Sequence, residues 1–132
     1  MAVSIRALAL AALAAAALPA RGGEAVACHV DYGGETHVFL ATPVDSPYAV
    51  KVDAVGSHFL FRVVFRTRPA DLAAIKVYAY TDRDAGPALV HQGTWPYPPP
   101  AAAVYGFSGR QSVHEPQRDS ELRYWCELKN TP

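Results

Sequence analysis

The pattern of apolar and polar positions along this chain alternates with a period of two in several places, most clearly in SHFLFRVVFRTR, residues 57–68. The odd positions from 59 to 65 are all apolar. The even positions include a histidine and three arginines: His58, Arg62, Arg66 and Arg68. Because successive side chains of a strand point to opposite faces, this spacing predicts a strand with one buried face.

Segments near the two ends of the chain have the same period. Their apolar positions are Val26, Cys28, Val30 and Tyr32 in the first segment, and Leu122, Tyr124, Cys126 and Leu128 in the last. Further strands are predicted over 37–42, 48–55, 75–81 and 88–92, with turn residues between them and a brief helical turn over 70–74. About seven short strands predict an all-β protein, a small antiparallel β-sandwich, and a small barrel fits the same pattern.

The first twenty residues, MAVSIRALALAALAAAALPA, are typical of a secretory signal peptide. One arginine precedes an apolar run that is too short to span a bilayer as a helix, so we expect no transmembrane segment in the mature chain. Cleavage is expected after Ala20, or as late as Ala27, which leaves 21–132 as a single domain. Alanine-rich, lysine-poor usage is typical of a bacterial protein, so we expect a periplasmic or secreted protein.

The chain has two cysteines, Cys28 and Cys126, and each falls on the apolar side of its own predicted strand. In an oxidising compartment they are expected to pair, joining the first strand to the last. An alternative is a lipid anchor at Cys28, because the preceding residues AVA are similar to a bacterial lipidation signal.

The ending DSELRYWC, residues 119–126, resembles the end of immunoglobulin domains, in which a tyrosine stands two residues before a cysteine. The first cysteine lies too far upstream for that family, and no tryptophan follows it at the expected distance. The resemblance therefore implies a loosely immunoglobulin-like sandwich and no particular function.

Catalytic and metal-binding motifs are not evident. The formal net charge is zero, so we expect no general attraction to nucleic acid. Ser108 in GFSG lacks the spacing of a nucleophile elbow, and we expect no enzyme activity and no cofactor. The histidines are not spaced as metal ligands, although distant strands could gather them into a copper or zinc site: His29, His37, His58, His91 and His114.

Surface recognition is the function that these patterns favour. The row Arg62, Arg66 and Arg68 could bind carboxylate or phosphate groups, or could be a solvated row paired with acids such as Asp53 or Glu121. Opposite the apolar faces of their strands lie three aromatic residues that could dock a protein or a glycan, or could pack on each other: Tyr78, Tyr80 and Trp125.

The stretch TWPYPPP, residues 94–100, is stiff because its prolines enforce extended backbone. We interpret it as a connector between the sheets, with Trp95 or Tyr97 covering the end of the core. The sequence thus predicts an exported, non-catalytic binding or accessory protein. The alternatives are a periplasmic metal-binding protein that uses the histidines, and a carbohydrate-binding module that uses Trp95, Tyr97 and the other outward aromatics.

Overall fold

The computed structural model describes residues 23–100 and 104–130 of the chain. The predicted signal peptide, residues 1–20, lies outside them. The described residues form eight strands and two short 3₁₀ helices: β1 (Glu24–Tyr32), β2 (Glu35–Ala41), η1 (Pro47–Ala49), β3 (Asp53–Val55), β4 (Phe59–Arg66), η2 (Ala70–Leu72), β5 (Ala74–Thr81), β6 (Ala88–Pro96), β7 (Gln111–Glu115) and β8 (Ser120–Asn130).

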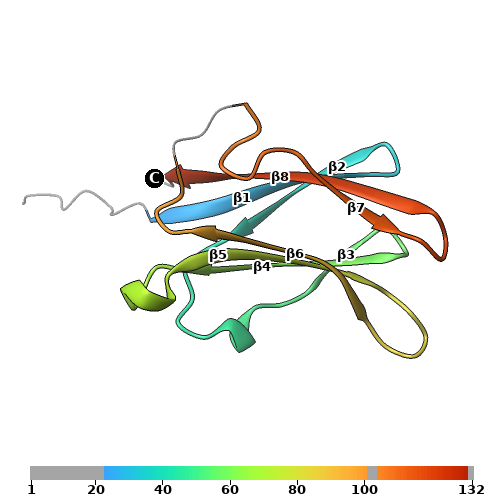
Figure 1. Cartoon of the computed structure of the whole chain (residues 1–132), viewed down its shortest axis with the longest axis horizontal. Helices are drawn as coiled ribbons and strands as arrows, with labels where there is room; N and C mark the ends of the chain where they lie inside the picture. The colour runs from blue at the N-terminus through green and yellow to red at the C-terminus, as the bar shows by residue number, and fades with distance from the viewer. Residues whose placement is uncertain (1–22, 101–103, 131–132) are drawn as a thin grey trace, which may run out of the picture.

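The strands make two antiparallel sheets that face each other (Figure 1). The first sheet has the order β2-β1-β8-β7 and the second has the order β3-β4-β5-β6. The predicted all-β sandwich is therefore confirmed. Within the sheets, each pair joins strands that are consecutive in sequence, except that β8 lies beside β1. This is the strand order of an up-and-down barrel. Hydrogen bonding is interrupted between β2 and β3 and between β6 and β7, so the structure is a sandwich and not a closed barrel.

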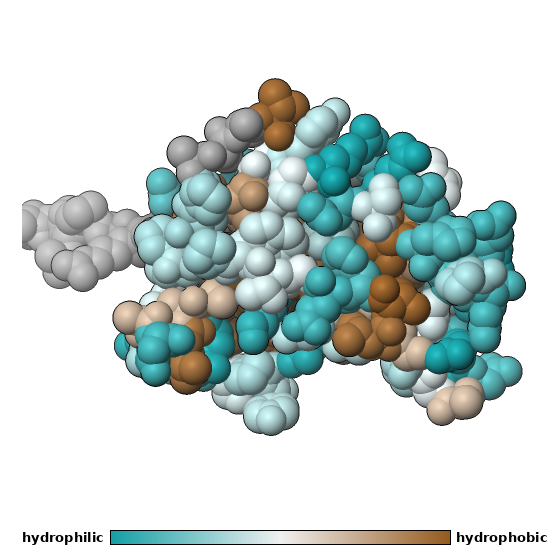
Figure 2. All heavy atoms as spheres, in the orientation of Figure 1, coloured by the Kyte–Doolittle hydropathy of each residue, from teal (hydrophilic) through white to brown (hydrophobic). Residues whose placement is uncertain are grey.

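The core lies between the sheets and is built mainly from the inward positions that the period of two identified. Phe59, Phe61 and Phe65 of β4 are buried against Val30 of β1 and Leu122 of β8, among other apolar residues. Figure 2 shows apolar atoms gathered between the two sheets on one side of the molecule, with hydrophilic residues around them. Burial of this apolar surface is the main force that holds the sheets together.

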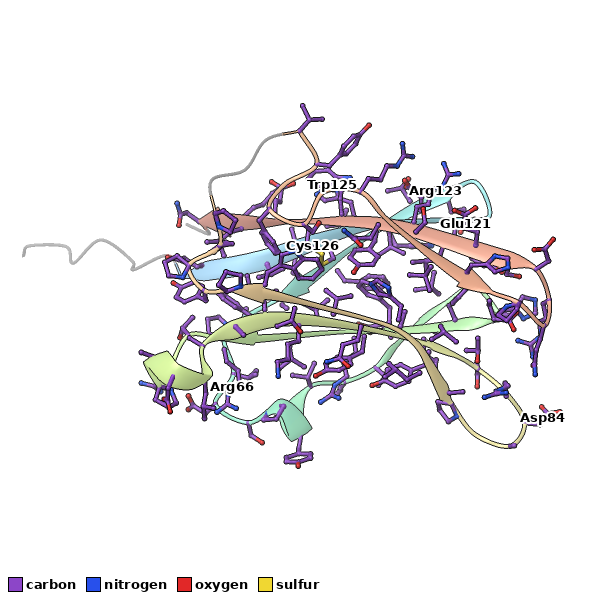
Figure 3. All side chains as sticks on the ribbon, in the orientation of Figure 1. Arg66, Asp84, Glu121, Arg123, Trp125 and Cys126 are labelled. Carbon is purple, nitrogen blue, oxygen red and sulfur yellow. A yellow bond between two sulfur atoms is a disulfide. The ribbon has the colours of Figure 1, made fainter. Side chains whose placement is uncertain are left out.

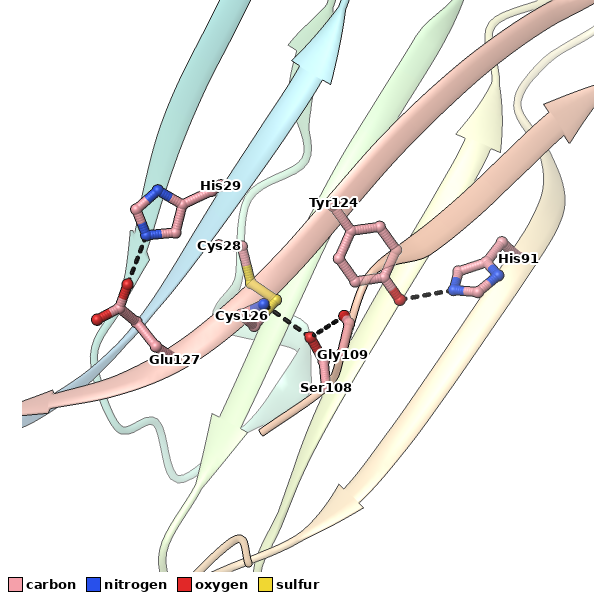
Figure 4. Close-up of a disulfide and its surroundings, with 8 residues drawn as sticks. All are labelled: Cys28, His29, His91, Ser108, Gly109, Tyr124, Cys126 and Glu127. Carbon is pink, nitrogen blue, oxygen red and sulfur yellow. Dashed lines mark hydrogen bonds and ion pairs between the residues drawn. A yellow bond between two sulfur atoms is a disulfide. The ribbon is translucent and has the colours of Figure 1, made fainter. Parts of the chain in front are cut away.

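The disulfide between Cys28 and Cys126 joins β1 to β8, as predicted, and both residues are fully buried (Figure 4). The two cysteines are directly opposite each other in the register of one sheet. An immunoglobulin disulfide instead joins two sheets, so the likeness to that family ends at the sandwich architecture. The bond also uses the sulfur atom that a lipid anchor at Cys28 would need.

Three local features differ from the sequence expectations. The predicted strand over 48–55 is wrong except at Asp53–Val55, because the chain first makes η1, where the Ser46 hydroxyl accepts a hydrogen bond from the Tyr48 N–H. The strand predicted over 88–92 continues to Pro96, which an edge strand tolerates. Strand β7 was not predicted, whereas the helical turn predicted over 70–74 is present at Ala70–Leu72.

Candidate functional site

The outer face of the second sheet gathers several of the residues that the sequence singled out. In the register of β4 and β5, Arg62 lies opposite Tyr78, and Leu60 lies opposite Tyr80. Arg66 and Lys76 share this face because they stand an even number of residues from Arg62 and Tyr78 in their own strands. We call the set Arg62, Arg66, Lys76, Tyr78 and Tyr80 the cationic face.

The aromatic residues of the cationic face are partly covered by their neighbours. The rings of Tyr78 and Tyr80 stack with their centroids 6.5 Å apart. The guanidinium of Arg62 lies over the Tyr78 ring, 5.5 Å from its centroid, and donates a hydrogen bond to the carbonyl of Pro47. These contacts hold the two tyrosines in a fixed arrangement that is half-buried and still reaches solvent.

A pocket of about 130 Å³ opens on the cationic face, where η1 and η2 approach the sheet. Strands β4 and β5 supply its floor, Pro47 of η1 supplies one wall and Leu72 of η2 another. Its complete lining is Pro47, Val64, Arg66, Leu72, Ala74, Lys76 and Tyr78. We call it the Arg66–Lys76 pocket. It combines two cations and a phenol with apolar walls.

The two cations of this pocket have no acidic partner in the part of the chain that the structure describes. Neither Arg66 nor Lys76 forms an ion pair with any described residue. The Nε atom of Arg66 is shielded from solvent and has no hydrogen-bond acceptor among the described residues. Buried polar groups of proteins are almost always hydrogen-bonded, so an unpaired Nε in a residue that lines the pocket is unusual.

Arg68, by contrast, does not extend the basic row. Its guanidinium forms a hydrogen-bonded ion pair with the carboxylate of Asp45, with 3.0 Å between Nε and Oδ1. This hydrogen bond and the charge of Arg68 lower the pKa of the Asp45 carboxyl, and Arg66 contributes more weakly in the same direction. The acids that the sequence suggested as partners lie elsewhere: Glu121 pairs with Arg123 at 3.3 Å, and Asp53 stands opposite Phe61.

Trp125 belongs to a different surface, on the outer side of the first sheet. Figure 3 shows Trp125 and Arg66 on opposite sides of the sandwich. The indole stacks on the imidazole of His29 with centroids 3.9 Å apart, and the ring of Tyr105 meets it edge-on at 6.0 Å. The Nε2 atom of His29 lies 2.7 Å from a carboxylate oxygen of Glu127. Trp125 is thus partly covered by neighbouring side chains and lies on a separate face.

Trp95 and Tyr97 are partly buried and pack against the core. Trp95 meets Phe107 edge-on at 5.7 Å, and Tyr97 meets Phe65 in the same way at 5.4 Å. The Tyr97 hydroxyl donates a 2.7 Å hydrogen bond to the carboxylate of Glu24, which raises the pKa of Tyr97. After Pro96 the chain passes from β6 in the second sheet toward β7 in the first.

The five histidines do not converge among the described residues, where no three His, Cys, Asp or Glu side chains gather as metal ligands. Four of the imidazoles have separate partners: Glu127 for His29, Glu35 for His37, Tyr124 for His91 and Asp119 for His114. The Nδ1 atom of His58 is buried without a hydrogen-bond partner among the described residues.

Figure 4 shows two contacts near the disulfide that sequence reasoning missed. The hydroxyl of Tyr124 lies 2.6 Å from Nε2 of His91, so one hydrogen bond joins β8 in the first sheet to β6 in the second. Burial raises the pKa of Tyr124 strongly and lowers that of His91. The hydroxyl of Ser108 accepts a hydrogen bond from the Cys126 N–H at 2.8 Å and donates one to the carbonyl of Gly109 at 2.7 Å, so its contacts are structural.

Fold and surface together define a small disulfide-linked β-sandwich with a cationic pocket on one outer face. Comparisons with protein-family models, with curated proteins and with solved structures return no match to this chain. Within residues 23–100 and 104–130, no helix is long and apolar enough to cross a membrane.

Proposed function

We propose that this protein is exported and, without catalysing a reaction, binds an acidic partner through its cationic face. One observation carries the proposal: Arg66 and Lys76 line a pocket and have no ion-pair partner among the described residues. Surface arginines are more often paired with acids or freely solvated. Two unpaired cations beside a pocket with apolar walls favour a ligand that carries negative charge.

The composition of the cationic face also suits protein recognition. Arginine and tyrosine are enriched at interfaces, where a few such residues carry most of the binding energy. Tyr78 and Arg62 already hold each other in place, so they would lose little side-chain freedom on binding. By comparison, the described residues gather no group of three metal-ligating side chains, and Trp95 and Tyr97 are partly buried against the core, so the cationic face is the better supported surface.

Export is supported by the leader-like sequence and by the buried disulfide, because such bonds persist in oxidising compartments. Strand β1 begins at Glu24, and Ala25, Val26 and Ala27 are buried. Cleavage after Ala20 would leave this strand intact, whereas cleavage after Ala27 would remove its first four residues. We therefore favour the earlier site.

Affinity capture tests the proposed function. The immobilised mature protein is incubated with the exported proteins of its native cell, and the wild type is compared with the double variant Arg66→Gln/Lys76→Gln. A matched control, Arg83→Gln/Lys129→Gln, removes two exposed positive charges outside the cationic face. We expect a partner that the wild type and the control retain, that the double variant loses, and that salt releases. A partner that the double variant retains as well as the wild type would contradict the proposal.

A further inference from the structure

We infer that the Arg66–Lys76 pocket is a carboxylate site, which takes a single carboxylate group on an aliphatic stem from a partner protein. This inference rests on the proposed function, because it specifies what part of an acidic partner enters the cationic face. The carboxylate could come from an acidic side chain or from a chain terminus, and a titration with one probe for each separates these two sources.

The placement of the two cations follows from the register of β4 and β5. Arg66 lies opposite Ala74, and Lys76 is two residues farther along β5 on the same face. Diagonal neighbours of this kind are about 7–8 Å apart, within reach of long side chains. Ala74 is small, so it leaves space in the floor between the two charged side chains. A carboxylate in that space would meet both.

The walls are held by contacts that do not use the pocket's own donors. Pro47 accepts a hydrogen bond from Arg62, and the Val44 N–H just before η1 donates to the carbonyl of Phe65 at 2.9 Å. On the other side, the Leu72 N–H donates to the carbonyl of Pro69 at 3.0 Å. The pocket is therefore shaped before a ligand arrives, which lowers the entropic cost of binding.

Charge on this face leaves the site available. The charge of Arg66 acts weakly on the carboxylate of Asp45. That carboxylate is bound by Arg68 and does not line the pocket. The guanidinium of Arg66 and the ammonium of Lys76 thus have donors without acceptors among the described residues, and Tyr78 also lines the pocket.

The walls discriminate between kinds of anion. Val64, Leu72 and Ala74 are apolar, and they would contact the methylene groups of an aliphatic carboxylate. An inorganic phosphate has no apolar part to place there and would have to shed its water. A volume of about 130 Å³ accommodates a group of a few heavy atoms, such as the end of a glutamate side chain. These walls favour a carboxylate over phosphate.

The test is a nuclear magnetic resonance titration of the folded mature protein at constant ionic strength, with sodium chloride replaced by each probe. N-acetylglutamate α-amide carries only a side-chain carboxylate, and N-acetylleucine carries only a terminal one. N-acetylglutamine amide is the uncharged control for the first, and inorganic phosphate is the competing anion. The signals followed are the backbone amides of β4 and β5 and the Nε–H of Arg66.

We expect at least one carboxylate probe to give saturable shifts centred on Arg66, Lys76 and Tyr78, and the tighter of the two identifies the source. The glutamine amide should give none, and phosphate should bind more weakly. Lys76→Gln and Arg66→Gln should each weaken binding at least fivefold, and Arg83→Gln should not. Shifts that never saturate, that centre elsewhere, that the glutamine amide reproduces, or that phosphate produces at lower concentration would overturn the inference.

Two controls separate this inference from other failures. Circular dichroism and thermal unfolding establish whether each variant is folded. If Arg66→Gln does not fold, Lys76→Gln alone tests the site. If the partner is captured through Arg66 and Lys76 but neither carboxylate probe binds, the proposed function stands and the carboxylate site is wrong. If a carboxylate probe binds in this pocket but the double variant captures the same partners as the wild type, the carboxylate site stands and the proposed function is wrong.

Discussion

At the scale of single residues, Gly106 has a tightly constrained position in the segment that precedes β7. Its φ is +63°, a backbone conformation that favours glycine, and a Cβ atom there would overlap the carbonyl of Cys126. The neighbouring Phe107 N–H donates to that carbonyl at 3.1 Å. Gly106 thus allows this segment to lie along β8 beyond the end of β7.

Substitution of Gly106 by alanine should therefore lower the free energy of unfolding substantially. Gly109 is the matched control, because its φ is +65° but a Cβ atom there would meet nothing within 4 Å. Gly109→Ala should cost about 1–2 kcal/mol from backbone strain alone, whereas Gly106→Ala adds a clash with main-chain atoms and should cost about 3 kcal/mol or more. Urea unfolding of both variants measures the difference. Equal losses would show that the close approach to Cys126 is unimportant.

At the scale of strands and sheets, the contact between His91 and Tyr124 ties β6 to β8 across the core. Burial holds the pKa of His91 below its ordinary value of 6.5, so below about pH 6.5 the unfolded chain binds a proton that the folded chain resists. Stability should therefore fall as the pH drops through that value.

The prediction is that His91→Gln loses less stability than the wild type between pH 7 and pH 5. Glutamine can still hydrogen-bond the Tyr124 hydroxyl but does not titrate. Urea unfolding at each pH gives the comparison, with His114→Gln, an exposed histidine, as the control. If the wild type and His91→Gln respond to pH in parallel, protonation of His91 does not contribute to acid sensitivity.

The disulfide is the second tie between elements, and it closes a sequence separation of 98 residues. The chain-entropy model gives about 4–5 kcal/mol for a loop of that length. Cys28→Ala/Cys126→Ala should lose a comparable amount, which is a large part of the stability of a small domain. Urea unfolding of the wild type and of this variant provides the measurement. A variant as stable as the wild type would mean that β1 and β8 hold together without the bond.

The same elements show how far the sequence could predict this fold. Strands β1, β4, β5 and β8 follow directly from a period of two, because each has one apolar face. Strand β7 was not predicted because one of its inward, buried positions is an acid, Glu115. The Glu115 carboxylate accepts hydrogen bonds from the N–H groups of Gln117 and Arg118 at 2.8 and 2.9 Å. An acidic residue whose side chain is hydrogen-bonded by its own turn cannot be recognised as a core position from the pattern of hydrophobicity.

The candidate site was predictable to a similar degree. Strand alternation by itself places Arg62 and Arg66 on one face of β4, and Tyr78 and Tyr80 on one face of β5. The pocket was not predictable, because Pro47 and Leu72 reach it from loops whose paths the period of two does not describe. Alternation also places Lys76 on the face of Tyr78 and Tyr80, although it does not indicate that Lys76 lines a pocket. The ion pair between Arg68 and Asp45 was not predictable either, because it depends on the path of the loop before η1.

At the scale of the whole molecule, the sandwich separates two outer faces with different characters. On the outer face of the first sheet, His29 stacks on Trp125 and pairs with Glu127, so these side chains have partners within the protein. On the second sheet, Arg66 and Lys76 have no such partners among the described residues. The formal net charge is zero, so attraction to an acidic partner would be local to the cationic face and not a property of the whole surface.

The role of the cationic face is tested most sharply by the dissociation constant of the captured partner, measured by calorimetry for the wild type and for Arg66→Gln/Lys76→Gln at one ionic strength. We expect at least a tenfold weaker complex for the double variant, a change of about 1.4 kcal/mol or more. Arg83→Gln/Lys129→Gln should bind as the wild type does. Equal dissociation constants for the wild type and the double variant would contradict the central claim that the cationic face is the binding surface.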